Sequence, residues 1–294
     1  MVSRLDLDGT HSPLGLVTKI IQAEPNLPIP VPVHELAFQL DISEIRELET
    51  AGFLGGLLTN EERSFGAILV AEGLSHHRTR FTVAHELGHF LNPYHKPANE
   101  GQFLCDSAAF SQLDVRTKHR AHKMEAEANR FAAYLLMPPP VLRQTIDSKR
   151  YASLKTVVEI HEIFDVSKES AARAYVEYCA ETVAIIIAKN GKLLRYYPGR
   201  TFPKLALGKG NRIPEVSLCH SNGFKGQLTE SDPTDVHHWI DGDWISPVRG
   251  LYEQVLFLSN GYSFIHLKAV MADPDEFDPE ERMTSAERLR SRLR

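Results

Sequence analysis

The segment His85-Glu86-Leu87-Gly88-His89 has the residue types and the spacing needed to bind a metal ion and activate water. On a helix, His85 and His89 lie one turn apart on the same face, so two imidazoles can reach one ion, with Glu86 beside it. Zinc lowers the pKa of its bound water from about 15.7 to near 7, and an adjacent carboxylate can take the proton as the water attacks a carbonyl group. We therefore predict a zinc-dependent hydrolase in which Glu86 is the general base.

The motif alone is moderately specific, because a chain with this content of His and Glu contains it by chance roughly 0.05 times. The plain alternative is a surface helix whose histidines face water. Apolar residues surround the motif on most sides of the predicted helix: Phe81, Val83, Ala84, Leu87, Phe90 and Leu91. Two buried histidines and a buried carboxylate need a partner, and a cation satisfies all three. The sequence therefore favours a metal site.

A catalytic zinc usually takes three protein ligands, so one more residue is required. One candidate is His95, which stands six residues after His89, where the H-E-x-x-H-x-x-G-x-x-H motif of metzincins has its last histidine. Asn92 replaces the glycine of that motif, and the following Pro93 restricts its backbone. The other candidate is Glu125, and the choice between them depends on the next helix.

That helix is predicted over residues 116–136, and Glu125 falls within its apolar stripe. Glu127 falls outside the stripe, grouped with Arg130 on a flank where a solvated ion pair is expected. Asn129 lies one turn after Glu125 and could accept a hydrogen bond from the free ring nitrogen of a ligating histidine, or equally lie on the helix surface. From the residues alone, Glu125 and His95 both stay open as the third ligand.

The rest of the chain divides into helical and strand segments. Periodicity and capping residues predict helices over 13–23, 33–40, 153–163 and 167–178, the last two forming a pair like a helix-turn-helix. A strand is expected over 66–70, and two hairpins over 183–197 and 252–270, with Asn190-Gly191 and Asn260-Gly261 at their turns. A charged tail with one exposed helix is expected from Asp273 onward.

Two segments, RFTVAHELGHF (80–90) and MEAEANRFAAYLLMP (124–138), closely resemble the ImmA/IrrE family of bacterial zinc metallopeptidases. The resemblance implies Zn²⁺ bound by His85, His89 and Glu125, with Glu86 catalytic and His95 the alternative ligand. It also implies a gluzincin-like peptidase that cleaves a helix-turn-helix repressor of the Xre type, in a stress or DNA-damage response or in the induction of mobile elements.

The layout further resembles the three-domain, radiation-response branch of that family. The expected fold class is α+β: a mainly helical minimal metallopeptidase domain with a small sheet over residues 1–146, a helix-turn-helix-like helical pair over 147–181, and a GAF-like α+β module with a charged tail over 182–294. The GAF-like assignment rests on strand pattern and length, and fold-level analogy does not establish a ligand.

Composition limits the classes of function. The net charge of −5 differs from the basic excess of most nucleic-acid-binding proteins, and Lys168 and Arg173 on the second helix of the pair are balanced by Glu169 and Glu177. Direct DNA binding is therefore disfavoured. Acids near the start of the chain, the lack of a long apolar stretch and three separated cysteines predict a cytoplasmic protein without a membrane span.

Two other functions compete with a repressor-cleaving peptidase. One is a DNA-binding or protein-binding transcriptional regulator with a structural or vestigial metal site, and the other is a toxin–antitoxin component with the same chemistry. The residue that stabilises the oxyanion stays open among several neighbours of the motifs. These are His76, His77, Arg116, His119, His122 and Tyr134.

Overall fold

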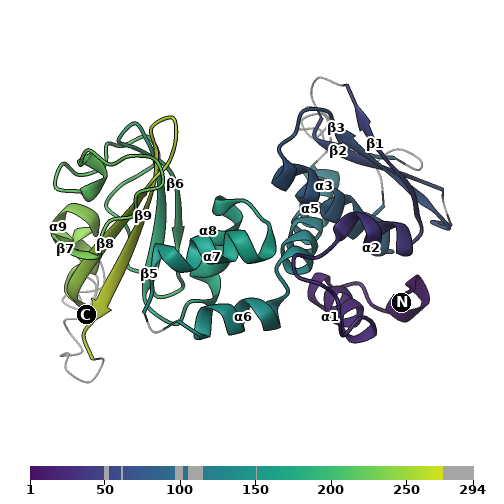
Figure 1. Cartoon of the computed structure of the whole chain (residues 1–294), viewed down its shortest axis with the longest axis horizontal. Helices are drawn as coiled ribbons and strands as arrows, with labels where there is room; N and C mark the ends of the chain where they lie inside the picture. Colours follow the sequence, from purple (N-terminus) through teal and green to yellow (C-terminus); the bar gives the residue numbers. More distant parts are fainter. Residues whose placement is uncertain (50–52, 61, 97–101, 105–114, 150, 274–294) are drawn as a thin grey trace, which may run out of the picture. The chain divides into compact units, whose positions relative to one another are not determined.

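The computed structural model describes residues 1–49, 53–60, 62–96, 102–104, 115–149 and 151–273, without the side chains of 102–104 and 115–118. The chain forms two compact units: unit 1 comprises Met1–Leu142 with Ile160–Ser167, and unit 2 comprises Arg143–Glu159 with Lys168–Arg294. Each unit contains its own sheet, so the fold is α+β, as predicted (Figure 1). The predicted domain boundaries at residues 146 and 181 remain a prediction.

Unit 1 is built from a four-stranded sheet and helices that pack against it. A short 3₁₀ helix, η1 (Arg4–Leu7), precedes the helices α1 (Pro13–Ala23), α2 (Val33–Gln39), α3 (His76–Leu91) and α5 (Val115–Leu136). The strands are β1 (Ile42–Leu48), β2 (Gly55–Thr59), β3 (Gly66–Ala71) and β4 (Gln102–Leu104). The predicted helices and the strand over 66–70 are confirmed, whereas β1, β2 and β4 were not predicted.

The sheet of unit 1 has the order β1-β3-β2-β4, in which β1 and β3 are parallel and the other neighbours antiparallel. Helix α3 packs against β2 and β3, and also against α2 and α5. Ten consecutive residues of α3, from Thr82 to Leu91, are therefore buried. The helix ends at Leu91 because Asn92 takes an extended backbone (φ −90°, ψ 109°) ahead of Pro93.

Three helices precede the sheet of unit 2: α6 (Pro139–Asp147), α7 (Leu154–Phe164) and α8 (Lys168–Tyr178). Residues of α6 and α7 are divided between the two units, and α8 belongs to unit 2. The strands are β5 (Val183–Lys189), β6 (Lys192–Pro198), β7 (Asp232–Thr234), β8 (Val248–Phe257) and β9 (Tyr262–Met271). They form an antiparallel sheet in the order β6-β5-β9-β8-β7. The short helices η2 (Leu218–His220), α9 (Val236–Trp239) and η3 (Gly242–Trp244) lie between β6 and β8 in the sequence.

The turns of the two predicted hairpins are confirmed. Asn190 and Gly191 have φ values of 49° and 69°, and Asn260 and Gly261 have values of 57° and 72°. Two successive positive φ values are the requirement of a type I′ turn, which matches the twist of the flanking strands. The Asn-Gly pairs therefore set the register of β5 with β6 and of β8 with β9.

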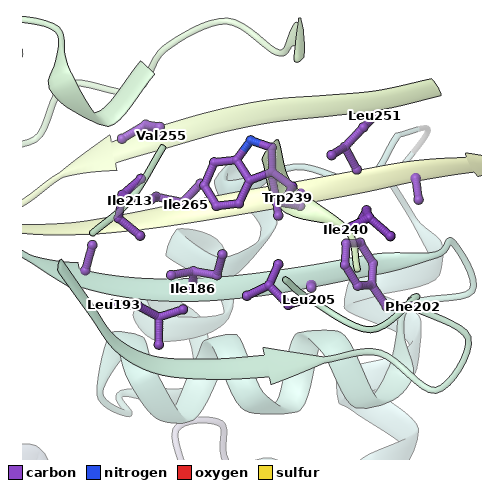
Figure 2. Packing of buried hydrophobic residues seen from close by; sticks show 14 of the residues in the cluster. Ile186, Leu193, Phe202, Leu205, Ile213, Trp239, Ile240, Leu251, Val255 and Ile265 are labelled. Carbon is purple, nitrogen blue, oxygen red and sulfur yellow. The ribbon is translucent and has the colours of Figure 1, made fainter. Parts of the chain in front are cut away.

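Both faces of the unit 2 sheet are covered, so six of the seven residues of β5 are buried. Side chains alternate between the faces of a strand. Ile186 belongs to a core that also contains Trp239, which is completely buried in the middle of the cluster (Figure 2). Helix α8 packs against β5 and β6, and its Tyr175 hydroxyl lies 3.2 Å from Nε2 of the buried His266 on β9.

Among the residues that the structure describes, every helix is too short or too polar to span a bilayer. The predicted charged tail lies outside those residues except for Asp273, with which it begins.

Candidate metal centre

Two neighbouring helices of unit 1 bring three potential ligands together. His85 and His89, on α3, are 7% and 0% exposed, and Glu125 comes from α5. His85 Nε2 lies 3.2 Å from His89 Nε2. The Glu125 carboxylate lies 3.3 Å from each of these nitrogens, through Oε2 to His85 and Oε1 to His89. Within the described part of the chain, this is the one group of His, Cys, Asp and Glu side chains close enough to hold a metal ion.

The spacing of these atoms fits a tetrahedral ion. Metal–ligand distances of about 2.0–2.1 Å, typical of zinc with nitrogen and carboxylate ligands, give a tetrahedron whose edges are about 3.3 Å long. The two histidine nitrogens are 3.2 Å apart, and each lies 3.3 Å from a different oxygen of Glu125, so each of these pairs separately has the length of such an edge. Two imidazoles and one carboxylate are also the ligand types of a catalytic zinc that keeps a fourth position open. The donor set therefore fits the predicted metal in both chemistry and size.

Glu86 is completely buried beside this group. The close approach of β2 encloses its carboxylate: a Cβ atom at Gly55 would lie 3.1 Å from Glu86 Oε1 and 2.2 Å from Thr82 Cγ2. Glycine at this position therefore lets the strand pass next to the motif helix. The negative charge of Glu86 is one of the causes that raise the pKa of His85.

The titration of the three potential ligands reflects their mutual contacts. Burial, the largest effect, disfavours the charged form of His85, but the hydrogen bond to Glu125, the charges of Glu86 and Glu125 and the contact with Asn129 together outweigh it and raise the pKa of His85 above its ordinary value. In His89, burial dominates and lowers the pKa to about 4. Burial alone would raise the pKa of Glu125, but hydrogen bonds to His85 and His89 hold it well below its usual range. The carboxylate is therefore ionised and His89 is neutral near pH 7, the forms that bind a metal, whereas the raised pKa of His85 favours its charged form in the absence of a metal.

A family model described as the IrrE N-terminal-like domain, Peptidase_M78, matches residues 44–175. This part of the chain is thus similar to the IrrE N-terminal-like domain. The resemblance inferred from the two sequence segments is thereby confirmed, and both segments lie inside the match. The match to a peptidase family suggests a metallopeptidase, and the His-His-Glu group is a possible metal site.

The chain is also similar to a solved structure titled Mycobacterium tuberculosis transcriptional regulator, with a TM-score of 0.50 and 11% sequence identity. The similarity covers 90% of this chain and 92% of that chain, and at this identity it concerns the fold alone. No curated protein matches the sequence significantly.

Glu125 and His95, the two candidates for the third ligand, lie on opposite sides of the His89 ring. Glu125 faces the Nε2 atoms of both motif histidines. His95 lies on the other side of the His89 ring, with its Nδ1 atom 3.0 Å from His89 Nδ1. Its Nε2 atom is 3.0 Å from Glu127 Oε2. The expectation that Glu127 is only a solvated flank residue is therefore wrong, although its outer side does face Lys123 at 3.9 Å.

Of the two places that the sequence left open for Asn129, the structure has the one beside a motif histidine. The Asn129 Oδ1 atom lies 3.2 Å from Nδ1 of His85, the nitrogen that does not face Glu125. A contact of this kind fixes which ring nitrogen carries the proton and leaves Nε2 free to bind a metal. Glu125 and Asn129 thus act from one face of α5, as expected for residues four apart.

Arg63 binds the carbonyl groups at the end of α3, a contact that the sequence did not predict. Its guanidinium donates to the carbonyl groups of His89 at 3.0 Å, Phe90 at 3.2 Å and Asn92 at 2.6 Å, and also to that of His95. A cation at this end of a helix satisfies carbonyl groups that have no partner within the helix. Arg63 lies 26 residues before His89, and no local pattern signals the contact.

Two of the candidate oxyanion-stabilising residues bind elsewhere. His76 and His77, in the first turn of α3, contact the Asp165 carboxylate at 2.6 and 3.2 Å, and Arg80 Nε contacts it at 3.1 Å. These contacts tie the start of α3 to the segment between α7 and α8. The oxyanion-stabilising residue stays unassigned among the others.

Proposed function

We propose that the chain is a zinc-dependent, site-specific endopeptidase that cleaves a helix-turn-helix repressor of the Xre type. The observation that carries this proposal is the cluster of His85 Nε2, His89 Nε2 and the Glu125 carboxylate, whose ligand atoms lie within 4.8 Å of one another, next to the buried Glu86. Zinc held there would polarise a peptide carbonyl group and lower the pKa of a bound water to near 7.

Each of the four residues has a defined role in this proposal. His85, His89 and Glu125 hold the metal. Glu86 takes the proton of the attacking water and passes it to the leaving amine, the work of a general base and then a general acid. Its enclosure between α3 and β2 keeps the carboxylate out of bulk water, where electrostatic interactions are weaker.

The proposed substrate is a protein, which agrees with the peptidase family of residues 44–175. The Xre-type repressor and the stress, DNA-damage or mobile-element response come from the family resemblance. A protease that acts inside the cytoplasm needs a narrow specificity, and we assign recognition of the repressor to the helical pair and the C-terminal module. Whether the chain works in a stress response or in a toxin–antitoxin pair depends on the neighbouring gene, since the chemistry is the same.

The packing of α8 supports a protein substrate over direct DNA binding. In a helix-turn-helix, the second helix must enter the major groove. Here the corresponding helix packs against β5 and β6, with five of its eleven residues buried. Its Glu169 carboxylate accepts a hydrogen bond from the Tyr197 hydroxyl and pairs with Arg195, both on β6. These contacts hold the first turn of the helix against the sheet of its own unit.

The substitution Glu86→Gln tests the proposal. It keeps the size of the side chain but removes the base, so we expect zinc binding and the thermal unfolding midpoint to be retained. Cleavage of the Xre-type repressor encoded beside the gene should fall about 10²–10⁴-fold. Glu72→Gln, the same change at an exposed position, is the matched control. Undiminished cleavage by Glu86→Gln would refute the proposed mechanism. A salt-dependent gel shift by the purified chain would instead support the regulator alternative.

A further inference from the structure

Polar side chains contact the ring of His89 on the side of Nδ1, opposite the candidate metal site. Its Nε2 atom faces His85 and Glu125, and its Nδ1 atom lies 3.0 Å from His95 Nδ1. These contacts continue from His95 Nε2 to Glu127 Oε2, also at 3.0 Å. His89 and His95 are 0% and 1% exposed, so water does not compete for these contacts. We propose that His95 and Glu127 are positioning residues that fix the ring of His89 as a metal ligand. This inference rests on the proposed metal site.

The direction of the hydrogen bonds follows from the chemistry of imidazole. A ring nitrogen that binds a metal carries no proton, so ligation through Nε2 puts the proton of His89 on Nδ1. That N–H donates to Nδ1 of His95, which must then carry its own proton on Nε2 and donate it to the Glu127 carboxylate. The opposite arrangement would put a proton on His89 Nε2, between the two groups that make up the rest of the site. The carboxylate of Glu127 therefore selects the tautomer that ligation needs.

The loop that carries His95 is itself fixed by side-chain contacts. Asn92 Oδ1 accepts from the backbone N–H of Tyr94 at 3.1 Å, and its Nδ2 donates to the carbonyl oxygen of His11 at 3.0 Å. Nδ2 lies 2.9 Å from His95 Nε2 and 3.4 Å from Glu127 Oε2. With the proton of His95 on Nε2, both nitrogens donate to this one oxygen, which accepts more than one hydrogen bond when ionised, and their 2.9 Å approach is a contact of two donors and not a hydrogen bond between them. His95 is thus held in place before any metal binds.

The two motif histidines are supported by different groups. Nδ1 of His85 lies 3.2 Å from the neutral amide oxygen of Asn129. Nδ1 of His89 instead contacts the imidazole of His95, which in turn contacts the Glu127 carboxylate. A carboxylate at the end of this chain of contacts makes Nε2 of His89 more electron-rich than an amide does. Glu125, Glu127 and Asn129 are alternate residues of α5, so one helix supplies a ligand and a support for each motif histidine.

The test measures metal affinity in the full chain, with zinc and a competing chromophoric chelator. We expect His95→Ala to weaken zinc binding about 10–100-fold, the usual effect of losing such a support. His95→Asn should restore most of the affinity, because its amide oxygen can occupy the place of Nδ1. His95→Gln should not, because its amide reaches the place of Nε2 instead. Glu127→Ala should weaken binding, while Lys123→Met, which changes only the exposed side of Glu127, is the control.

If His95 positions His89, the Asn and Gln variants should differ in zinc affinity. A purely structural role of His95 would instead lower the thermal unfolding midpoint measured without zinc. If His95→Ala fails to fold, the Asn and Gln variants and Glu127→Ala carry the test. Unchanged zinc affinity in folded His95→Ala, or equal losses in the Asn and Gln variants, would overturn the inference. Zinc binding by wild type without repressor cleavage would defeat the proposed function and leave this inference standing. No zinc binding at His85 and His89 would defeat both.

Discussion

The contact between α3 and α5 at Gly88 makes a sharp prediction about the metal centre. A Cβ atom at Gly88 would lie 2.8 Å from Cδ1 of Phe131 and 3.2 Å from its Cβ and Cγ. Phe131 is 1% exposed and lies on α5, six residues after Glu125. The absence of a side chain at Gly88 therefore lets the helix that carries Glu125 approach the helix that carries His85 and His89.

The magnitude of the effect of Gly88→Ala follows from these distances. The shortest contact falls about 0.7 Å short of the roughly 3.5 Å at which carbon atoms attract. Overpacking of this kind costs about 1–3 kcal/mol, while alanine gains up to about 1 kcal/mol over glycine within a helix. The net loss of stability is thus about 0–2 kcal/mol, and the protein should fold. A relative shift of the helices by several tenths of an ångström opens the 3.3 Å contacts of Glu125, so zinc affinity should fall at least ~10-fold.

The assay compares zinc affinity and thermal unfolding in Gly88→Ala and Gly242→Ala. Gly242 is the matched control, because a Cβ atom there would meet nothing within 4 Å and the residue has no positive φ. A second substitution, Phe131→Leu, removes the ring carbon that makes the shortest contact and should recover part of the lost affinity. If Gly88→Ala binds zinc as tightly as wild type, the close approach of the helices does not set the geometry of the site, and the reasoning fails.

Two further predictions concern stability. Arg63→Met removes the donor from the carbonyl groups after His89, so the free energy of unfolding should drop by about 2–4 kcal/mol in urea titrations; a loss below ~0.5 kcal/mol would contradict this role. His266 has its pKa lowered by burial from 6.5 to about 4, so the unfolded chain binds more protons between these values. Stability should be full above pH 6.5 and fall by about 3 kcal/mol towards pH 4, and His266→Gln should flatten this dependence in unfolding curves recorded at several pH values.

Much of the site was predictable because its signals are local. The H-E-x-x-H spacing needs only one helix turn, and Glu125 and Asn129 share a face of a second helix that its own periodicity reveals. The Asn-Gly pairs specify the two hairpin turns for the same reason: positive φ values at 190 and 191 are a property of two adjacent residues.

The features that escaped prediction depend on contacts between distant segments. The strand β2 begins with two glycines, which have low strand propensity, and it exists because it pairs with β3 and β4 and passes next to Glu86. Arg63 reaches carbonyl groups 26 to 32 residues away. His95 has the spacing of a ligand, but whether its ring faces the metal or the back of His89 depends on Asn92 and Glu127.

The burial of Trp239 makes tryptophan fluorescence a measure of the unfolding of unit 2. The chain contains two tryptophans, Trp239 and Trp244, and both belong to unit 2. Trp239 is completely buried, whereas Trp244 is 44% exposed. Indole emission will therefore follow the melting of the C-terminal unit alone, and the unit that carries the candidate metal centre contributes no such signal. Comparing emission with far-ultraviolet circular dichroism, which sees both units, will show whether zinc stabilises one unit or the whole chain.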